Sequence, residues 1–179
     1  PQVHSWLNST PHQGPVGNNE RSAEEEERGV KKFYVASAIS NIVNVRYVAQ
    51  ALESQGYVNT YDWTRNATER DGGTVSPGDL RSIGEHERDA VIGADIVVIL
   101  LPGGKGTHVE LGIAIAQRSR IILHSPTKSI WNPGTTSTFY HLAEVEKCHG
   151  TLDDLLTMIL TEPHAMAPGV ALAGASRTD

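Results

Sequence analysis

Residues 95–112 read Asp-Ile-Val-Val-Ile-Leu-Leu-Pro-Gly-Gly-Lys-Gly-Thr-His-Val-Glu-Leu-Gly, and this segment constrains how the rest of the chain can fold. It begins with a β-branched apolar run, passes through a glycine-rich turn and carries one carboxylate, Glu110, soon afterwards. An apolar run of this kind is typical of a central strand that is buried on both faces. The segment therefore predicts a strand over 96–101 and a helix over 107–118. Because that helix is apolar nearly all round, we expect it to be largely buried.

Other apolar runs and amphipathic segments alternate along the chain on both sides of this segment. Further strands are expected at 33–37, 57–62, 121–124 and 144–147, and further helices at 42–52, 79–93 and 151–160. Strands that alternate with helices form parallel sheets, because each connection must cross one face of the sheet. We predict a single α/β domain, flavodoxin-like or Rossmann-like, with a mostly parallel five-stranded sheet and helices on both faces.

Composition divides the chain into three regions. Residues 1–29 are polar and residues 163–179 are rich in Pro, Ala, Gly and Ser, so we expect a disordered leader and a flexible tail. Residues 30–162 should form the α/β domain. Long loops are expected at 65–78 and 125–138, and their length suggests that they cover a ligand.

Charge and cysteine content exclude several classes of protein. The net charge of −6, with no basic stripe, argues against nucleic-acid polymers as partners. Cys148 is the single cysteine, so an intramolecular disulfide is impossible and a reducing compartment is favoured. No apolar run approaches the length that spans a membrane. We expect a cytoplasmic protein that binds a small molecule.

Three glycines, Gly103, Gly104 and Gly106, follow the predicted central strand. They either make a tight turn or leave room for a ligand beside the backbone, and ligands of parallel α/β sheets bind at the carboxyl ends of strands. The spacing fits neither the P-loop pattern GxxxxGK[ST] nor the dinucleotide pattern GxGxxG. Glu110 lies three residues after Thr107, so it could close a capping box, or it could act as a catalytic carboxylate.

Other candidate groups lie on neighbouring elements. Glu85, Glu87 and Asp89 belong to one predicted helix, and any of them could turn toward the site or form a solvated face. Tyr34 is expected in the first strand, as a core residue with a satisfied hydroxyl. Asp62 and Trp63 end the second strand, where they could bind a base or simply terminate the strand.

The histidines and the cysteine predict no metal site. His108-Val109-Glu110 matches the H-x-E part of the zinc deaminase pattern, but that site also needs P-C-x-x-C, and one cysteine excludes it. The G-x-S-x-G pattern of serine hydrolases is also missing. We predict neither a metal nor another cofactor.

Together, three segments resemble the nucleoside 2-deoxyribosyltransferase-like family, which includes 2′-deoxynucleoside 5′-phosphate N-hydrolases. They are Phe33-Tyr34-Val35-Ala36-Ser37, Ala94-Asp95-Ile96-Val97-Val98 and Val109-Glu110-Leu111-Gly112. The resemblance covers roughly residues 32–161. It implies a Glu110 nucleophile that attacks C1′ of a nucleoside or nucleotide, releases the base and forms a glycosyl-enzyme ester.

The same resemblance assigns further roles. Tyr34 matches the family tyrosine that bonds the nucleophile. Glu87 stands where the family often has an Asp, and it would steer the sugar or help to protonate the leaving base. The monophosphate hydrolases carry Ser and Arg for phosphate in the loop after the first strand, whereas this chain has Ala38 and Ser40 there. Replacements for phosphate binding could be Lys105, Thr107 or Arg46.

A second resemblance is local. Residues 102–110 read Pro-Gly-Gly-Lys-Gly-Thr-His-Val-Glu and satisfy the PGGxGTxxE signature of the cytokinin-activating phosphoribohydrolases, which also cleave N-glycosidic bonds. The glycine-rich first loop and the Arg-Lys helix motif of those enzymes are missing here, so this resemblance ranks second.

We therefore predict an N-glycosidase or deoxyribosyltransferase that acts on a nucleoside or nucleoside 5′-monophosphate, and the resemblance implies a homodimer or larger assembly. The alternatives are a cytokinin-type phosphoribohydrolase and a nucleotide-binding sensor without turnover. The predicted catalytic residues are Glu110, Tyr34 and Glu87. The predicted substrate-binding residues are Ser37, Ser40, Asn41, Asp62, Trp63, Gly103, Gly104, Lys105, Gly106 and Thr107.

Overall fold

The computed structural model describes residues 30–65 and 76–161, and those from Lys31 onward belong to one compact unit. The strands are β1 (Lys32–Ala36), β2 (Val58–Asn59), β3 (Ile96–Leu100), β4 (Arg120–Ser125) and β5 (Val145–His149). The α-helices are α2 (Ile42–Ser54), α4 (Pro77–Ile92), α5 (Lys105–Gln117) and α6 (Leu152–Leu160). Short 3-10 helices are η1 (Ile39–Asn41), η2 (Trp63–Arg65), η3 (Lys128–Trp131) and η4 (Thr138–His141).

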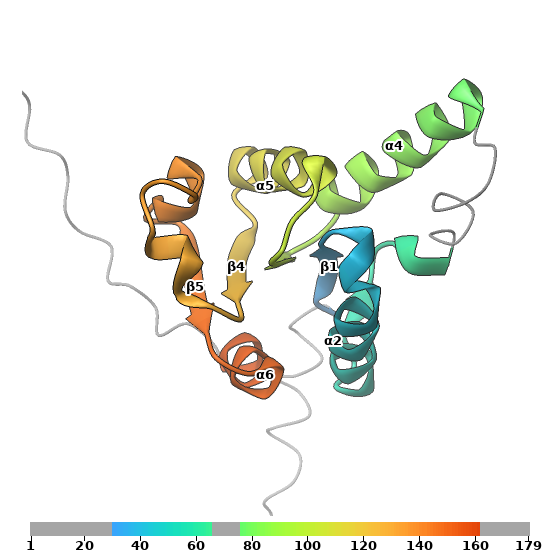
Figure 1. Cartoon of the computed structure of the whole chain (residues 1–179). Coiled ribbons are helices and arrows are strands. Elements are labelled where there is room, and N and C mark those ends of the chain that lie inside the picture. Colours follow the sequence, from blue (N-terminus) through green and yellow to red (C-terminus); the bar gives the residue numbers. More distant parts are fainter. Residues whose placement is uncertain (1–29, 66–75, 162–179) are drawn as a thin grey trace, which may run out of the picture. The chain divides into compact units, whose positions relative to one another are not determined.

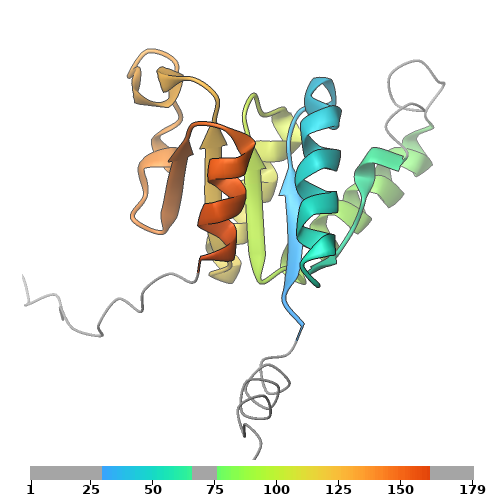
Figure 2. The ribbon, with the colours of Figure 1, turned by 90° about the horizontal axis from the view of Figure 1, so that it is seen from below.

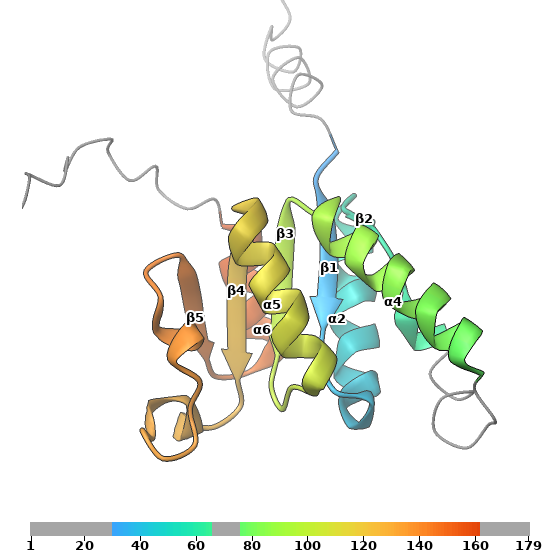
Figure 3. The ribbon, with the colours of Figure 1, turned by 90° about the horizontal axis from the view of Figure 1, so that it is seen from above.

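The strands form a single five-stranded sheet in the order β2-β1-β3-β4-β5, and every pair of neighbours is parallel. Figure 1 shows the whole chain, and Figure 3 labels all five strands in this order. This confirms the predicted α/β class, and the order is that of the flavodoxin-like sheets. All five residues of β3 are buried, as expected for a central strand. The chain leaves β1 toward β2 and then crosses back to β3 on the other side of β1, so the connection changes direction between β1 and β3.

Helices cover both faces of the sheet. Helices α2 and α6 lie on one face, and α4 and α5 lie on the other (Figures 2 and 3). The reversal of direction explains why α2 lies opposite α4 and α5, because right-handed crossovers in opposite directions place their helices on opposite faces. Helix α6 follows the last strand and packs beside α2. The core lies between these layers and includes Phe33, Leu52, Leu123 and Leu155, none of which has exposed surface.

One predicted burial pattern is wrong. Helix α5 is not buried all round, because it presents one face to the sheet and leaves the other side open, so Val109 is 64% exposed. In α4, the apolar side chain of Leu80 is also 54% exposed. It belongs to the first turn of α4, whereas the buried residues of that helix, Ala90 and Val91, belong to its last turn.

Several predicted boundaries also differ, and α5 begins at Lys105 rather than at residue 107. Strand β2 has two residues rather than six, because the chain turns after Asn59, whose side chain accepts a hydrogen bond from the Tyr61 N–H (3.2 Å). Helix α4 begins at Pro77 instead of Asp79, because Ser76 and Asp79 form a reciprocal capping box. The predictions for 1–29, 163–179 and most of the loop at 65–78 lie outside the described residues. None of the described helices is long and apolar enough to cross a membrane.

The capping box of α6 supports a stability prediction. The Thr151 hydroxyl accepts a hydrogen bond from the Asp154 N–H (3.1 Å), and Asp154 in turn accepts one from the Thr151 N–H (2.9 Å). We expect Thr151→Ala to lower the free energy of unfolding by about 1 kcal/mol, measured by urea denaturation. The control is Thr157→Ala in the middle of the same helix, where a change within about 0.5 kcal/mol is expected. Equal losses in both variants would contradict the capping role.

Candidate active site

A cleft of about 460 Å³ lies at the carboxyl ends of β1 and β3. This is the point where the connections change direction, and ligands of such sheets bind there. The volume falls within the range of small-molecule sites. The cleft is lined by Ser37, Ala38, Ile39, Ser40, Trp63, Glu87, Gly104, Lys105, Gly106, Thr107 and Glu110.

A hydrogen bond from Tyr34 holds Glu110 from behind, and Tyr34 itself does not line the cleft. The Tyr34 hydroxyl, from β1, donates to Oε1 of Glu110, from α5, over 2.6 Å. Tyr34 has no exposed surface and Glu110 is only 7% exposed. An ionised carboxylate is costly to bury without partners, and a short hydrogen bond to a charged acceptor is among the stronger ones. The structure therefore holds this carboxylate in a fixed position at the edge of the cleft.

The alternative role of Glu110 in a capping box is not what the structure has. Helix α5 begins at Lys105, with Gly104 as its N-cap, and Thr107 is the third helical residue. The Thr107 hydroxyl accepts a hydrogen bond from the Gly104 N–H (3.0 Å), so Thr107 performs the N-terminal capping. Glu110 lies in the second turn, where the backbone N–H groups are already used within the helix.

Glu87 is the second carboxylate of the cleft. It comes from α4, is half-buried and lines the cleft together with Glu110. Glu85 and Asp89 belong to the same helix, are exposed and do not line the cleft. The carboxylate that the family resemblance selected is thus the one that α4 turns toward the site.

Burial raises the pKa of the Tyr34 hydroxyl well above its ordinary value, and the neighbouring charge of Glu110 adds to the effect. The hydrogen bond to Glu110 and the charge of Glu87 act in the same direction. Tyr34 therefore remains a protonated donor under all ordinary conditions, which suits it to hold the Glu110 carboxylate.

The three glycines of the turn differ in whether the surrounding protein leaves room for a side chain. A Cβ on Gly103 would lie 2.9 Å from Cγ2 of Thr107, so the tight-turn interpretation accounts for this glycine. A Cβ on Gly104 would make only ordinary contacts, and one on Gly106 would meet nothing within 4 Å. Packing within the protein does not explain the last two glycines, which line the cleft.

The remaining wall of the cleft is partly apolar. Trp63 is buried, and its indole N–H donates to the carbonyl oxygen of Val35 over 2.8 Å, so the ring presents only apolar atoms to a ligand. Ala38 and Ile39 extend this surface. The sequence interpretation did not select Ala38 or Ile39 as lining residues, although their position directly after β1 was a usable signal.

Some predicted site residues support the cleft without lining it. Asn41 donates through Nδ2 to the Ser37 hydroxyl (2.9 Å), which itself donates to the Leu100 carbonyl (2.8 Å). Although burial opposes the ionisation of Asp62, hydrogen bonds from Thr64 and Arg65 lower its pKa. Asp62 thereby orders the segment that carries Trp63.

Two further candidate residues, Gly103 and Arg46, do not line the cleft. Gly103 lines a different cavity, on the far side of the turn. The guanidinium of Arg46 donates to Thr64 through Nε (3.1 Å) and Nη2 (3.0 Å) and does not line the cleft. Among the described lining residues, Lys105 is therefore the one with a positively charged side chain. Within residues 30–65 and 76–161, no three acidic, His or Cys side chains group as metal ligands would.

No protein-family model and no curated protein matches the chain. Among solved structures, the chain is similar to the CMP N-glycosidase BcmB of Clostridium botulinum, with 19% identity, a TM-score of 0.49, and coverage of 72% of this chain and 97% of the other. The chain is also similar to BlsM, with 18% identity, a TM-score of 0.49, and coverage of 78% of this chain and 99% of BlsM. A conserved protein of Enterococcus faecalis V583 has 18% identity and a TM-score of 0.49, with coverage of 73% of this chain and 98% of that protein. The fold stated above rests on the strand order and register of this chain.

The raised pKa of Tyr34 leads to a titration experiment. Because the fold favours the protonated phenol, its contribution to stability is complete below the ordinary tyrosine pKa and is lost only as the pH rises through the higher folded value. We expect the folded protein and Tyr34→Phe to develop the same tyrosinate absorbance up to about pH 11. In urea, where both chains are unfolded, the variant should show one tyrosine fewer. A difference already present in the folded proteins would contradict the burial of this hydroxyl.

Proposed function

We propose that this protein cleaves or exchanges the N-glycosidic bond of a nucleoside or a nucleoside 5′-monophosphate, with Glu110 as the nucleophile. The observation that carries the proposal is the 2.6 Å hydrogen bond from Tyr34 to a buried Glu110 carboxylate at the edge of a cleft. A carboxylate held in this way can attack a carbon or stabilise an oxocarbenium-like transition state. The resemblance of the sequence to the nucleoside 2-deoxyribosyltransferase-like family gives the reaction its substrate class.

The reaction takes place in two steps. A carboxylate oxygen of Glu110 attacks C1′, the bond between C1′ and the base nitrogen breaks, and its electron pair leaves with the base. Glu87 or a water supplies the proton that the departing base needs. Water then attacks C1′ of the ester, the bond between C1′ and the Glu110 oxygen breaks, and the water's proton returns to Glu87 or to solvent. In the transfer reaction a second base attacks instead, loses its N–H proton in the same way and forms a new nucleoside. The Tyr34 hydroxyl fixes the plane of the carboxylate throughout.

The lining of the cleft suits a ligand with one apolar face. Trp63 and Ile39 offer apolar surface, while Ser37 and Ser40 offer hydroxyls. Lys105 is the described lining residue that could contact a phosphate, because Ala38 and Ser40 stand where the monophosphate hydrolases carry Ser and Arg. We keep both the nucleoside and its monophosphate as substrates. The resemblance also implies a homodimer or larger assembly, which sedimentation of the full chain tests.

Two other functions have an observation in their favour. The segment 102–110 favours a cytokinin-type phosphoribohydrolase, which would act on ribonucleoside monophosphates and not on deoxyribonucleosides. The lack of the Ser and Arg pair for phosphate favours a nucleotide-binding sensor without turnover. A panel of nucleosides, deoxynucleosides and their monophosphates separates the three, because each function predicts a different pattern of released base.

The first test is the release of free base, detected by chromatography, with and without an acceptor base. We expect Glu110→Gln to reduce release to the uncatalysed background, because an amide cannot form the ester. Undiminished turnover in that variant would remove Glu110 as the nucleophile. If no panel member releases base but one raises the melting temperature, the sensor replaces the enzyme.

The second test compares two carboxylates of α4. We expect Glu87→Gln to lower kcat by about a hundredfold, because a general acid contributes to that extent. The matched control is Glu85→Gln, an exposed residue of the same helix that does not line the cleft, and its kcat should be unchanged. Equal effects of the two substitutions would mean that Glu87 has no special role in proton transfer.

The third test concerns phosphate. We expect Lys105→Met to raise the KM of a nucleoside monophosphate by about tenfold, the usual worth of a hydrogen bond to a charged group. The KM of the corresponding nucleoside should stay the same. Lys128→Met is the control, because Lys128 is an exposed lysine that does not line the cleft. A parallel rise in both KM values would show that Lys105 does not bind phosphate.

A further inference from the structure

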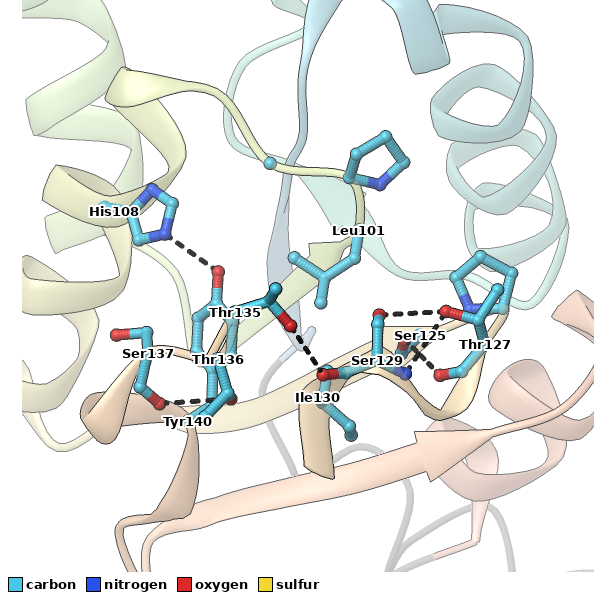
Figure 4. Close-up of a pocket in the computed structure, with 13 residues that line it drawn as sticks. Leu101, His108, Ser125, Thr127, Ser129, Ile130, Thr135, Thr136, Ser137 and Tyr140 are labelled. Atoms are coloured by element: carbon cyan, nitrogen blue, oxygen red, sulfur yellow. Dashed lines mark hydrogen bonds between the residues drawn. The ribbon is translucent and has the colours of Figure 1, made fainter. Parts of the chain in front are cut away.

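A second cavity, of about 500 Å³, lies on the other side of the turn that precedes α5. It shares no lining residue with the Glu110 cleft, although both lie at the carboxyl ends of strands. We call it the hydroxyl pocket. It is lined by Leu101, Pro102, Gly103, His108, Ser125, Pro126, Thr127, Ser129, Ile130, Thr135, Thr136, Ser137 and Tyr140 (Figure 4).

The chemistry of this lining is unusual for a chain with a net charge of −6. Among the described lining residues there is no Asp, Glu, Lys or Arg, whereas hydroxyl side chains come from β4, the loops that flank η3 and η4, and the two 3-10 helices themselves. A hydroxyl can both donate and accept a hydrogen bond. Such a lining matches a neutral ligand that itself carries hydroxyls. It offers no carboxylate, ammonium or guanidinium group to a charged ligand, and both ring nitrogens of its imidazole, His108, are engaged within the protein.

One wall of the hydroxyl pocket is held in place by contacts of His108 with Gly104 and Tyr140. Both ring nitrogens of His108 are engaged, one 2.9 Å from the Gly104 carbonyl oxygen and the other 2.8 Å from the Tyr140 hydroxyl. The rings of His108 and Tyr140 also stack, with centroids 5.8 Å apart. These contacts join α5 to η4, so the pocket has the largely pre-formed character of small-molecule sites.

The opposite wall is held by short hydrogen bonds. The buried Ser125 hydroxyl donates to the Thr127 carbonyl (2.6 Å), and the Thr127 hydroxyl bonds that of Ser129 (2.8 Å). Figure 4 shows these three residues on one side of the pocket and Ser137 with Tyr140 on the other, with Leu101 between them. Leu101 and Ile130 contribute apolar surface. The hydroxyls thus flank an apolar strip. This arrangement is complementary to a sugar ring, which has hydroxyls around its rim and C–H groups on its faces.

We propose that the hydroxyl pocket is a binding site for an uncharged sugar, either free or as the sugar of a nucleoside. The sugar ring would lie against Leu101, and its hydroxyls would bond Ser129 and Ser137. The Ser137 hydroxyl is half-buried and has no hydrogen-bond partner among the described residues, so it is available to the ligand. This site does not depend on the Glu110 reaction, because the two cavities have separate linings.

The experiment titrates the full chain with neutral probes and follows the backbone amide resonances. The probes are D-ribose, 2-deoxy-D-ribose and uridine, with inorganic phosphate as the charged comparison. Glu110→Gln is the background, so that uridine is not consumed. We expect saturable shifts at Ser129 and Ser137 with a neutral probe. Ser137→Ala should weaken that binding by about fivefold, and Ser40→Ala, the same change in the other cleft, should not alter it.

Each outcome has one meaning. Binding of uridine without binding of the free sugars supports the site and identifies its source as a nucleoside. Two results would overturn the proposal: no saturable shift with any neutral probe, or shifts at the pocket with phosphate alone. Weakening by Ser40→Ala but not by Ser137→Ala would place the sugar in the Glu110 cleft and also reject the site. Base release by the wild-type chain is measured separately, so failure of the pocket leaves the proposed reaction standing or falling on its own assay.

Discussion

The parallel pairing of β1 with β3 is the constraint on which the site depends. These strands are neighbours in the sheet but not in the sequence, and Tyr34 pairs with Val97 while Ala36 pairs with Ile99. Because the connections leave these two strands in opposite directions, their carboxyl ends open between the loops rather than beneath a crossover. The same pairing brings Tyr34 of β1 beneath α5, the helix that follows β3, and so makes the contact with Glu110 possible.

The buried carboxylate of Glu110 costs the fold desolvation free energy. Glu110 occupies a helix position that an apolar residue could fill without desolvation cost, and its neighbour Leu111 is almost completely buried. The fold instead provides Tyr34, a donor whose own pKa is raised so far by burial and by Glu110 that it stays protonated. It also brings a second carboxylate, Glu87, into the same cleft. Apolar residues in place of Glu110, Tyr34 and Glu87 would remove the repulsion between the two carboxylates and the cost of burying polar groups. Stability alone therefore does not account for these three residues.

The local pattern of apolar and polar residues was enough to predict the α/β architecture. It did not predict side-chain exposure where the packing of one element against another determines it. The alternation of apolar runs and amphipathic segments predicted the order of the described strands and α-helices. The exposure of Val109 could not be predicted, because an apolar helix surface does not say how far its neighbours extend. The choice of Glu87 over Glu85 needed the family resemblance, since spacing treats the two alike. The loop at 125–138 was predicted to cover a ligand, and it supplies most of the lining of the hydroxyl pocket. The sequence did not show that His108 and Leu101 complete that pocket, because they come from other elements.

The turn between β3 and α5 forms a wall for both cavities, and its hydrogen bonds explain how it can serve both. From the side of β1, the Ala38 N–H donates to the Pro102 carbonyl (3.2 Å), and from the side of β4, the His124 carbonyl accepts from the Leu101 N–H (3.0 Å). Thr107 closes the turn from within, and its contact with Gly103 leaves no room for a side chain there. These contacts hold the turn from three directions. The turn therefore positions Glu110 through the start of α5, while its other side lines the hydroxyl pocket.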